Sequence, residues 1–269
     1  MSWSTLRFIP WCVLPLACAA SQAPAPSAAP TRAAPLSANY RSVHIDSIAP
    51  DKMEQFEGAR REWLGELHRA HASDGRGVFL QVGANRFYTM RSFAQFSDFD
   101  TRGEVINRSL AAVPKGAAER YDRGDTALIF PHASEIWELD PNLGYTPAKG
   151  ALTEWTATCG WMVFEDVQPD PPSSDRYWSA TGEINSALAE GHYPLTRLSF
   201  RTVYGSGRVV TLWLAPSRAE LESTETVESA VARVRGAARA AELKAACDAS
   251  VVQRDTQPLI VRKDLTNMP

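Results

Sequence analysis

The first residues that could carry out chemistry are a histidine and an aspartate two positions apart, His44 and Asp46. The segment from Ser42 to Ile48 has the alternation of a strand, so both side chains should lie on one face. A histidine beside a carboxylate can act as a general base. With Tyr88 from another strand, the pair could orient or deprotonate a bound molecule, which makes these three the candidate catalytic residues. The simpler interpretation, which we favour, is that His44 and Asp46 bond each other or the backbone in the core.

The elements that would hold this set follow a regular order. A strand is followed by a helical stretch with apolar residues at three- and four-residue spacing, then by two strands joined at a glycine-containing turn. A second helical region, broken near Pro114, and a closing extended segment complete a βαββαβ unit. In chain order the expected segments are Ser42–Ile48, Pro50–His71, Gly77–Val82, Phe87–Phe93, Thr126–Phe130 and Glu135–Leu139.

The second half of the chain repeats this order. Its expected strands are Gly160–Val167, Leu198–Val203, Val209–Leu214 and Ser250–Leu265, with a helix around Tyr177 and Leu188 and another that starts at the capping box Ser217–Glu220. The tails Asn142–Pro147 and Asp264–Pro269 align at one offset, and the hairpins and first strands align at nearly the same offset. Segments in step indicate a duplicated domain, so we expect repeat 1 at residues 39–150 and repeat 2 at 151–269.

Two βαββαβ units in tandem, each with a Pro-Asp turn into an amphipathic helix, resemble the ferredoxin-like dimeric α/β-barrel superfamily. The first half, with its closing segment Asp140–Pro147, is similar to exported bacterial proteins of the NIPSNAP and antibiotic-biosynthesis-monooxygenase groups. The resemblance implies an α+β fold in which the two sheets pack face to face as an intrachain barrel. It also implies a small-molecule-binding or accessory protein. The alternatives are a cofactor-independent monooxygenase that uses the barrel cavity, and a non-catalytic structural or interaction module.

Strand alternation then sorts side chains between the helices and the barrel interior. We place Val43, Ile45, Val78, Leu80 and Val82 beneath the helices, and His44, Asp46, Phe79, Gln81, Tyr88 and Met90 inside the barrel. The equivalent interior set of the second half is Trp161, Val163, Glu165, Phe200, Thr202, Val209, Thr211 and Trp213. Aromatic walls with a few polar groups are typical of small-molecule sites. The ligand-binding candidates are therefore Phe79, Gln81, Met90, Trp161, Glu165, Phe200, Thr202 and Trp213, although a filled core between the repeats is the simpler interpretation.

The remaining histidines do not predict a haem or metal site. His68 and His71 share a helix face near Asp74 and could hold a metal, but two solvated histidines at a helix end are the favoured account. Barrel families that resemble chlorite dismutases bind haem through a histidine on a helix of the second repeat, whereas His192 falls in a loop, as His132 does. We therefore expect no haem, no metal and no other cofactor.

The start of the chain predicts export. Arg7 precedes the apolar run from Phe8 to Ala20, which has the length of a signal-peptide core and is too short for a transmembrane helix. We expect a signal peptide at residues 1–19, an Ala/Pro/Ser-rich disordered tether at 20–38, and a periplasmic or secreted protein. Cys18 is a candidate for acylation, and hence for a lipid anchor.

Composition limits the partners. With 44% hydrophobic residues, 22% charged residues and a net charge of -3 among 269 residues, the bulk of the chain is not disordered and lacks the basic excess of a nucleic-acid binder. We expect a small, largely apolar ligand. Cys159 and Cys247, the two cysteines outside the signal region, should lie at opposite ends of the second unit, too far apart for a disulfide.

Overall fold

The structure, a computed structural model, describes residues 40–73, 77–125, 129–203 and 208–267. The expected signal peptide, tether and acylated Cys18 lie outside these residues and stay predictions. Within the described part of the chain, no helix has the length and apolar character needed to cross a membrane.

The N-terminal half contains four strands and three α-helices in the expected order. These are β1 (Tyr40–Ile48), α1 (Met53–Arg69) after the 3-10 turn η1 (Pro50–Lys52), β2 (Val78–Val82), β3 (Arg86–Phe93), α2 (Asp98–Ala112), α3 (Ala117–Asp125) and β4 (Ile129–Leu139). The two closing segments expected here fall in the single strand β4, except for residues 126–128 of the first, which lie outside the described residues. His132, expected in a loop, lies in this strand opposite Asp46.

The C-terminal half also has four strands, and its last helical region is divided. Its elements are β5 (Cys159–Val167), α4 (Pro171–Glu190), β6 (Thr196–Thr202), β7 (Arg208–Ala215), α5 (Arg218–Ser223), α6 (Val227–Arg235), α7 (Ala237–Ala249), β8 (Val251–Val261) and η3 (Lys263–Leu265). Ser217 caps α5 by accepting a hydrogen bond from the Glu220 backbone N–H, as the capping box predicts. The expected continuous helix is interrupted at Gly236, whose φ of 87° lies in the left-handed region that favours glycine.

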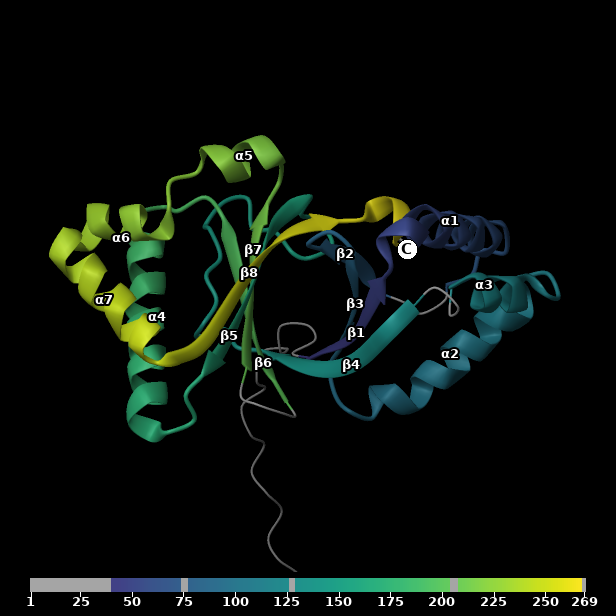
Figure 1. The fold of residues 1–269 in the computed structure, drawn as a ribbon, viewed down its shortest axis with the longest axis horizontal. Coiled ribbons are helices and arrows are strands. Elements are labelled where there is room, and N and C mark those ends of the chain that lie inside the picture. Colours follow the sequence, from purple (N-terminus) through teal and green to yellow (C-terminus); the bar gives the residue numbers. More distant parts are fainter. Residues whose placement is uncertain (1–39, 74–76, 126–128, 204–207, 268–269) are drawn as a thin grey trace, which may run out of the picture. The chain divides into compact units, whose positions relative to one another are not determined.

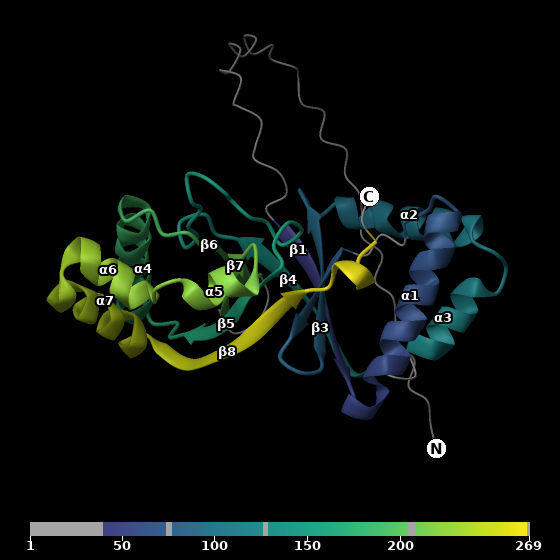
Figure 2. The ribbon, with the colours of Figure 1, turned by 90° about the horizontal axis from the view of Figure 1, so that it is seen from above.

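All eight strands form one closed antiparallel barrel in the order β1-β3-β2-β8-β5-β7-β6-β4 (Figure 1). Each half contributes four neighbouring strands, and the pairs β2–β8 and β4–β6 close the barrel between the halves. Helices α1, α2 and α3 cover the outside of the N-terminal strands, and α4, α6 and α7 cover the C-terminal strands (Figures 1 and 2). The expected intrachain barrel with helices on its outer face is therefore confirmed.

The assignment of strand faces was partly wrong. Directly opposed residues of an antiparallel pair share a face, and Val43 is opposed to Met90 while Leu80 is opposed to Tyr88. All four are buried in the cluster that fills the barrel. The residues correctly placed on the inner face are Tyr88, Met90, Phe200 and Thr202, whereas Val43, Ile45, Val78, Leu80 and Val82 are inside the barrel and not beneath the helices.

The opposite face holds the other residues that we expected in the interior. Val43 and Met162 point inward, so their strand neighbours point toward the helices. The residues that face outward are His44, Asp46, Phe79, Gln81, Trp161, Val163, Glu165, Val209, Thr211 and Trp213. Thr202 is half-buried and opposed to Trp137, which lies in the barrel cluster.

The segment that follows the last strand of each half docks on the other half. After β8, residues 262–267 dock on the N-terminal half, where Arg60 Nε donates to the Leu265 carbonyl at 3.0 Å and the Phe79 N–H donates to Thr266 Oγ1 at 3.1 Å. The Leu265 side chain is fully buried with Phe56 and Phe79. The end of the C-terminal half thus completes the packing between α1 and β2.

The reverse exchange follows β4. Tyr145 forms an isolated bridge with Arg197 on β6, and the Ser199 hydroxyl donates to the Leu143 carbonyl at 3.0 Å. Leu143 is buried in the cluster beneath α4. Each half therefore supplies a segment to the core of the other.

The two cysteines lie as expected. Cys159 is opposed to Ile260 at one end of the β5–β8 pair, whereas Cys247 precedes β8, which begins opposite Val167 at the other end. Both are buried free thiols.

Candidate functional site

His44 and Asp46 are brought together on the outer face of β1. His44 Nε2 lies 3.0 Å from Asp46 Oδ1, and its Nδ1 lies 2.9 Å from the Ser134 hydroxyl on β4. The Asp46 side chain is fully buried, and neither oxygen has an aligned hydrogen-bond donor among the described residues. The His132 ring lies 5.7 Å from the His44 ring. Ser134 and His132 were missed because their place opposite β1 depends on strand register.

Tyr88 does not join this group. It points into the barrel, where its ring lies 6.1 Å from Trp137 and 6.0 Å from Phe164. Burial raises the pKa of its hydroxyl. The sheet separates Tyr88 from His44 and Asp46, so the three candidate catalytic residues do not form one site.

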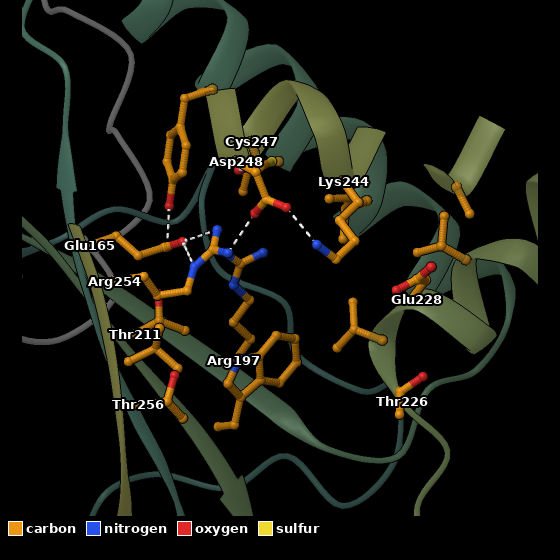
Figure 3. Close-up of a pocket in the computed structure, with 18 residues that line it drawn as sticks. Glu165, Arg197, Thr211, Thr226, Glu228, Lys244, Cys247, Asp248, Arg254 and Thr256 are labelled. Carbon is orange, nitrogen blue, oxygen red and sulfur yellow. Dashed lines mark hydrogen bonds and ion pairs between the residues drawn. The ribbon is translucent and has the colours of Figure 1, made fainter. Parts of the chain in front are cut away.

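A pocket of about 350 Å³ lies between the outer face of the C-terminal strands and helices α4, α6 and α7 (Figure 3). The strands contribute Val163, Glu165, Arg197, Thr211, Trp213, Arg254 and Thr256, and the helices and their caps contribute Tyr177, Thr181, Ile184, Thr226, Val227, Glu228, Val231, Ala240, Lys244, Cys247 and Asp248. α7 is rich in alanine, whose short side chain leaves space above the sheet. Of the predicted ligand-binding residues, Glu165 and Trp213 line this pocket.

A hydrogen-bonded carboxylate forms the base of the pocket. Tyr177 Oη donates to Glu165 Oε2 at 2.6 Å, and Arg254 Nε donates to Glu165 Oε1 at 2.8 Å. Burial, reinforced by the negative charge of Glu165, raises the pKa of Tyr177. Tyr177 is therefore a neutral donor, and the Glu165 oxygens are occupied.

Asp248 extends this network along one wall. It accepts hydrogen bonds from Arg254 Nη1 and Lys244 Nζ (Figure 3). Burial alone would raise the pKa of Asp248, but the bonds from Lys244 and Arg254 outweigh it and lower that pKa. Both cations are thus already matched by carboxylates.

The thiol of Cys247 is not activated. Burial raises its pKa, and the contact with Thr181 Oγ1 at 3.9 Å opposes this only in part. The thiolate is the reactive form of cysteine. The pocket therefore offers hydrogen bonds and apolar contact, and neither Tyr177 nor Cys247 has the lowered pKa of an activated nucleophile.

A second pocket of about 370 Å³ adjoins the first and shares Val163, Trp213, Thr226, Val227 and Thr256 with it. Trp161, a predicted ligand-binding residue, lines this second pocket and is 41% exposed. Trp161 therefore extends the apolar surface formed by Val163 and Trp213 beyond the first pocket.

The other predicted ligand-binding residues lie elsewhere. Phe79 is buried beneath α1, and Gln81 Oε1 accepts a hydrogen bond from Arg262 at 2.8 Å. Met90 and Phe200 are buried in the barrel core. The half-buried Thr202 donates to the Arg208 carbonyl at 3.4 Å. None of these residues lines the two pockets described above.

The pocket residues that we missed include Tyr177, Arg197, Lys244 and Arg254. Arg197 stands on a strand next to Leu198, which packs against the barrel core, whereas the strand neighbours of Arg254 are the polar residues Gln253 and Asp255. A charged residue beside a barrel-facing apolar one was therefore a signal for Arg197 and not for Arg254.

The donor set does not suit a haem or metal centre. The pocket lining contains no histidine, and the pKa values of Tyr177 and Cys247 are raised, which disfavours the anionic forms that bind haem iron. His192 is exposed in the turn after α4. His68 and His71 are at the end of α1, and Asp74 lies outside the described residues. Among the residues described, no three His, Cys, Asp or Glu side chains are placed to hold a metal.

Comparison with known proteins identifies the fold. A Fusobacterium nucleatum protein, provisionally named a monooxygenase, matches with a TM-score of 0.53 and 9% identity over 84% of this chain and 94% of that chain. A Lactobacillus acidophilus protein with the same provisional name matches at 0.47 and 9% identity, over 82% of this chain and 92% of its own. Chlorite dismutase from Candidatus Nitrospira defluvii matches at 0.45 and 8% identity, over 85% and 94%.

At this identity the likeness shows the ferredoxin-like α+β barrel and nothing further. No family model matches the sequence, and no curated protein matches it.

Proposed function

We propose that this chain binds a small, largely apolar organic molecule in the pocket beneath α4, α6 and α7. The observation that carries the proposal is the pocket itself, which has apolar walls and a few convergent polar groups, as small-molecule sites do. The mutual pairing of Glu165, Arg254 and Asp248 favours binding over acid–base catalysis, because these groups are engaged with one another.

A neutral fluorescent probe tests this proposal on the full chain. N-phenyl-1-naphthylamine becomes fluorescent in apolar surroundings, and we expect it to bind the native protein. Val227, half-buried on α6, lines both adjoining pockets, so Val227→Trp should place an indole in their mouths and reduce probe affinity about tenfold or more.

The matched control is Val252→Trp, the same change at a residue that is 72% exposed and lines neither pocket. It should bind the probe as the native protein does, and both variants should retain the native circular dichroism spectrum. Equal probe affinity of the native chain and Val227→Trp would overturn the proposal. Native mass spectrometry of the purified protein would then identify any molecule that co-purifies.

A cofactor-independent monooxygenase is the second candidate, favoured by the fold shared with the provisionally named Fusobacterium nucleatum monooxygenase. In such a reaction a substrate CH2 group and O2 give a carbonyl and water, so the substrate supplies all four electrons. Consumption of O2 in proportion to carbonyl product, lost in Val227→Trp, would support it. A barrel that serves only as a structural or interaction module would bind no probe and consume no O2.

The wider setting is part of the same proposal. The equal strand order of the two halves supports a tandem duplication with repeats at residues 39–150 and 151–269. The sequence of residues 1–38 supports export, with Cys18 as the candidate lipid anchor, and the closing segment Asp140–Pro147 supports a relation to the exported NIPSNAP and antibiotic-biosynthesis-monooxygenase groups. The mass of the mature N-terminal peptide after expression in a bacterial host tests cleavage and acylation together.

A further inference from the structure

Arg197 is a buried cation without a carboxylate partner. Its residue is 7% exposed on β6, and its side chain extends into the pocket (Figure 3). Nη1 donates to the Asn185 side chain at 3.1 Å, and the guanidinium lies 5.3 Å from the Trp213 ring centre. Nε is fully buried without a hydrogen-bond partner, and Nη2 bonds no described residue. One edge of the guanidinium, formed by Nε and Nη2, is therefore unused.

The other cations of the pocket differ from Arg197. Arg254 is bonded to Glu165 and Asp248, and Lys244 is bonded to Asp248. The remaining carboxylate of the lining, Glu228, is exposed on α6 and makes no ion pair with Arg197 in the described structure. The carboxylates of the pocket thus leave Arg197 uncompensated.

A buried guanidinium without a counter-charge is costly, and that cost falls when an anion enters. The Nε and Nη2 edge of arginine matches a carboxylate, which can accept two parallel hydrogen bonds from it. A single arginine supplies one positive charge, which matches a carboxylate better than a phosphate dianion. Beside it, Trp213, Val163 and Ile184 provide apolar walls for the rest of a ligand.

We propose that Arg197 anchors the carboxylate of an apolar or aromatic acid whose body lies against Trp213. This inference rests on the proposed function and adds the chemical class of the ligand. The carboxylate would take the free guanidinium edge, while Nη1 keeps its bond to Asn185 and the ring system contacts the apolar side of the pocket.

Two probes of the same shape test the anchor. 2-Naphthoate is an anion at pH 7, and 2-naphthamide is its neutral analogue. Titration calorimetry on the native chain should show tighter binding of the naphthoate. Arg197→Gln should weaken naphthoate binding about tenfold to a hundredfold, as expected for a lost charge-assisted hydrogen bond, and change naphthamide binding less than about threefold.

The control is Arg201→Gln on the same strand. Arg201 pairs with Asp140, stacks over Trp178 and lines neither pocket, so its replacement should leave both affinities unchanged. Arg197→Lys keeps the positive charge but cannot form the bidentate pair of hydrogen bonds, so it should retain part of the preference for naphthoate over naphthamide. Unfolding curves of each variant separate loss of binding from loss of fold.

The outcomes distinguish the two proposals. If both probes bind with equal affinity and Arg197→Gln affects them equally, the anion anchor is wrong and the apolar pocket remains. If neither probe nor the neutral dye binds the native chain, the proposed function fails and the anchor fails with it.

Discussion

The two helix-covered faces of the barrel each bury an arginine, and they use it differently. In the N-terminal half, Arg60 on α1 is fully buried, lies 4.5 Å from the Phe79 ring centre and donates to the Leu265 carbonyl. In the C-terminal half, Arg197 stacks on Trp213 but keeps one edge free. The same strand order thus supports a structural arginine on one side and an arginine available to a ligand on the other.

The difference comes from what fills the space between helices and sheet. Phe56, Phe79, Phe87 and Leu265 form a compact buried cluster beneath α1. On the other side, the covering layer is split at Gly236 into α6 and α7, and the alanines of α7 reach less far toward the strands. Side-chain size over the sheet therefore decides which face keeps a cavity.

The largest expected effect is the loss of stability when a cavity is made in the packed face beneath α1. Phe79→Ala should lower the free energy of unfolding by about 3–5 kcal/mol, because the ring is fully buried and Arg60 stacks on it. Trp213→Ala widens a pocket that is already open and should cost no more than about half as much. Urea denaturation measures both variants. Equal losses would show that the two faces are equally packed.

A smaller pair of effects tests the exchanged segments. Leu265→Ala and Leu143→Ala each remove a buried side chain and should each cost about 2–4 kcal/mol. Hydrogen exchange should rise first in α1 for Leu265→Ala and in α4 for Leu143→Ala, since each leucine packs in the half to which it docks. If hydrogen exchange rose first in the half whose chain contains the leucine, the docking of each segment on the other half would be wrong.

The smallest expected effect is a pH dependence confined to the N-terminal face. Hydrogen bonds from Arg262, and then Arg61, lower the pKa of Asp264 to about 2 from its ordinary value of 3.8. A lowered pKa stabilises the fold above the ordinary value, and that contribution is lost as the pH falls through about 2. Asp264 is 45% exposed, so its contribution is screened.

Asp264→Asn should therefore be slightly less stable than the native chain at pH 7 and equal to it near pH 2. Unfolding midpoints measured across this range check the sign. A difference that grew on acidification would contradict the assignment of Asp264 as the titrating group.

The order of elements was readable from the sequence because periodicity and turn residues report local structure. The sequence did not show which side chains face the barrel interior. Both faces of strands such as β2 and β7 are buried, so hydrophobicity does not distinguish the barrel side from the helix side. The pairing of Val43 with Met90 would have resolved it, since those two residues cannot face opposite ways. Arg197 was not predicted for a related reason. Its proposed role depends on an unpaired guanidinium edge, and the sequence does not show which hydrogen bonds a side chain lacks.

The exchanged segments also set an order on synthesis. Strand β8 and residues 262–267, which complete the N-terminal half, are synthesised after every strand of that half. Until then β2 is an unpaired strand edge, and such edges are prone to pairing with other chains. Contacts that join residues nearly 200 positions apart, such as Phe79 with Thr266, slow folding. The edge of β2 therefore stays exposed to other chains until β8 has paired with it.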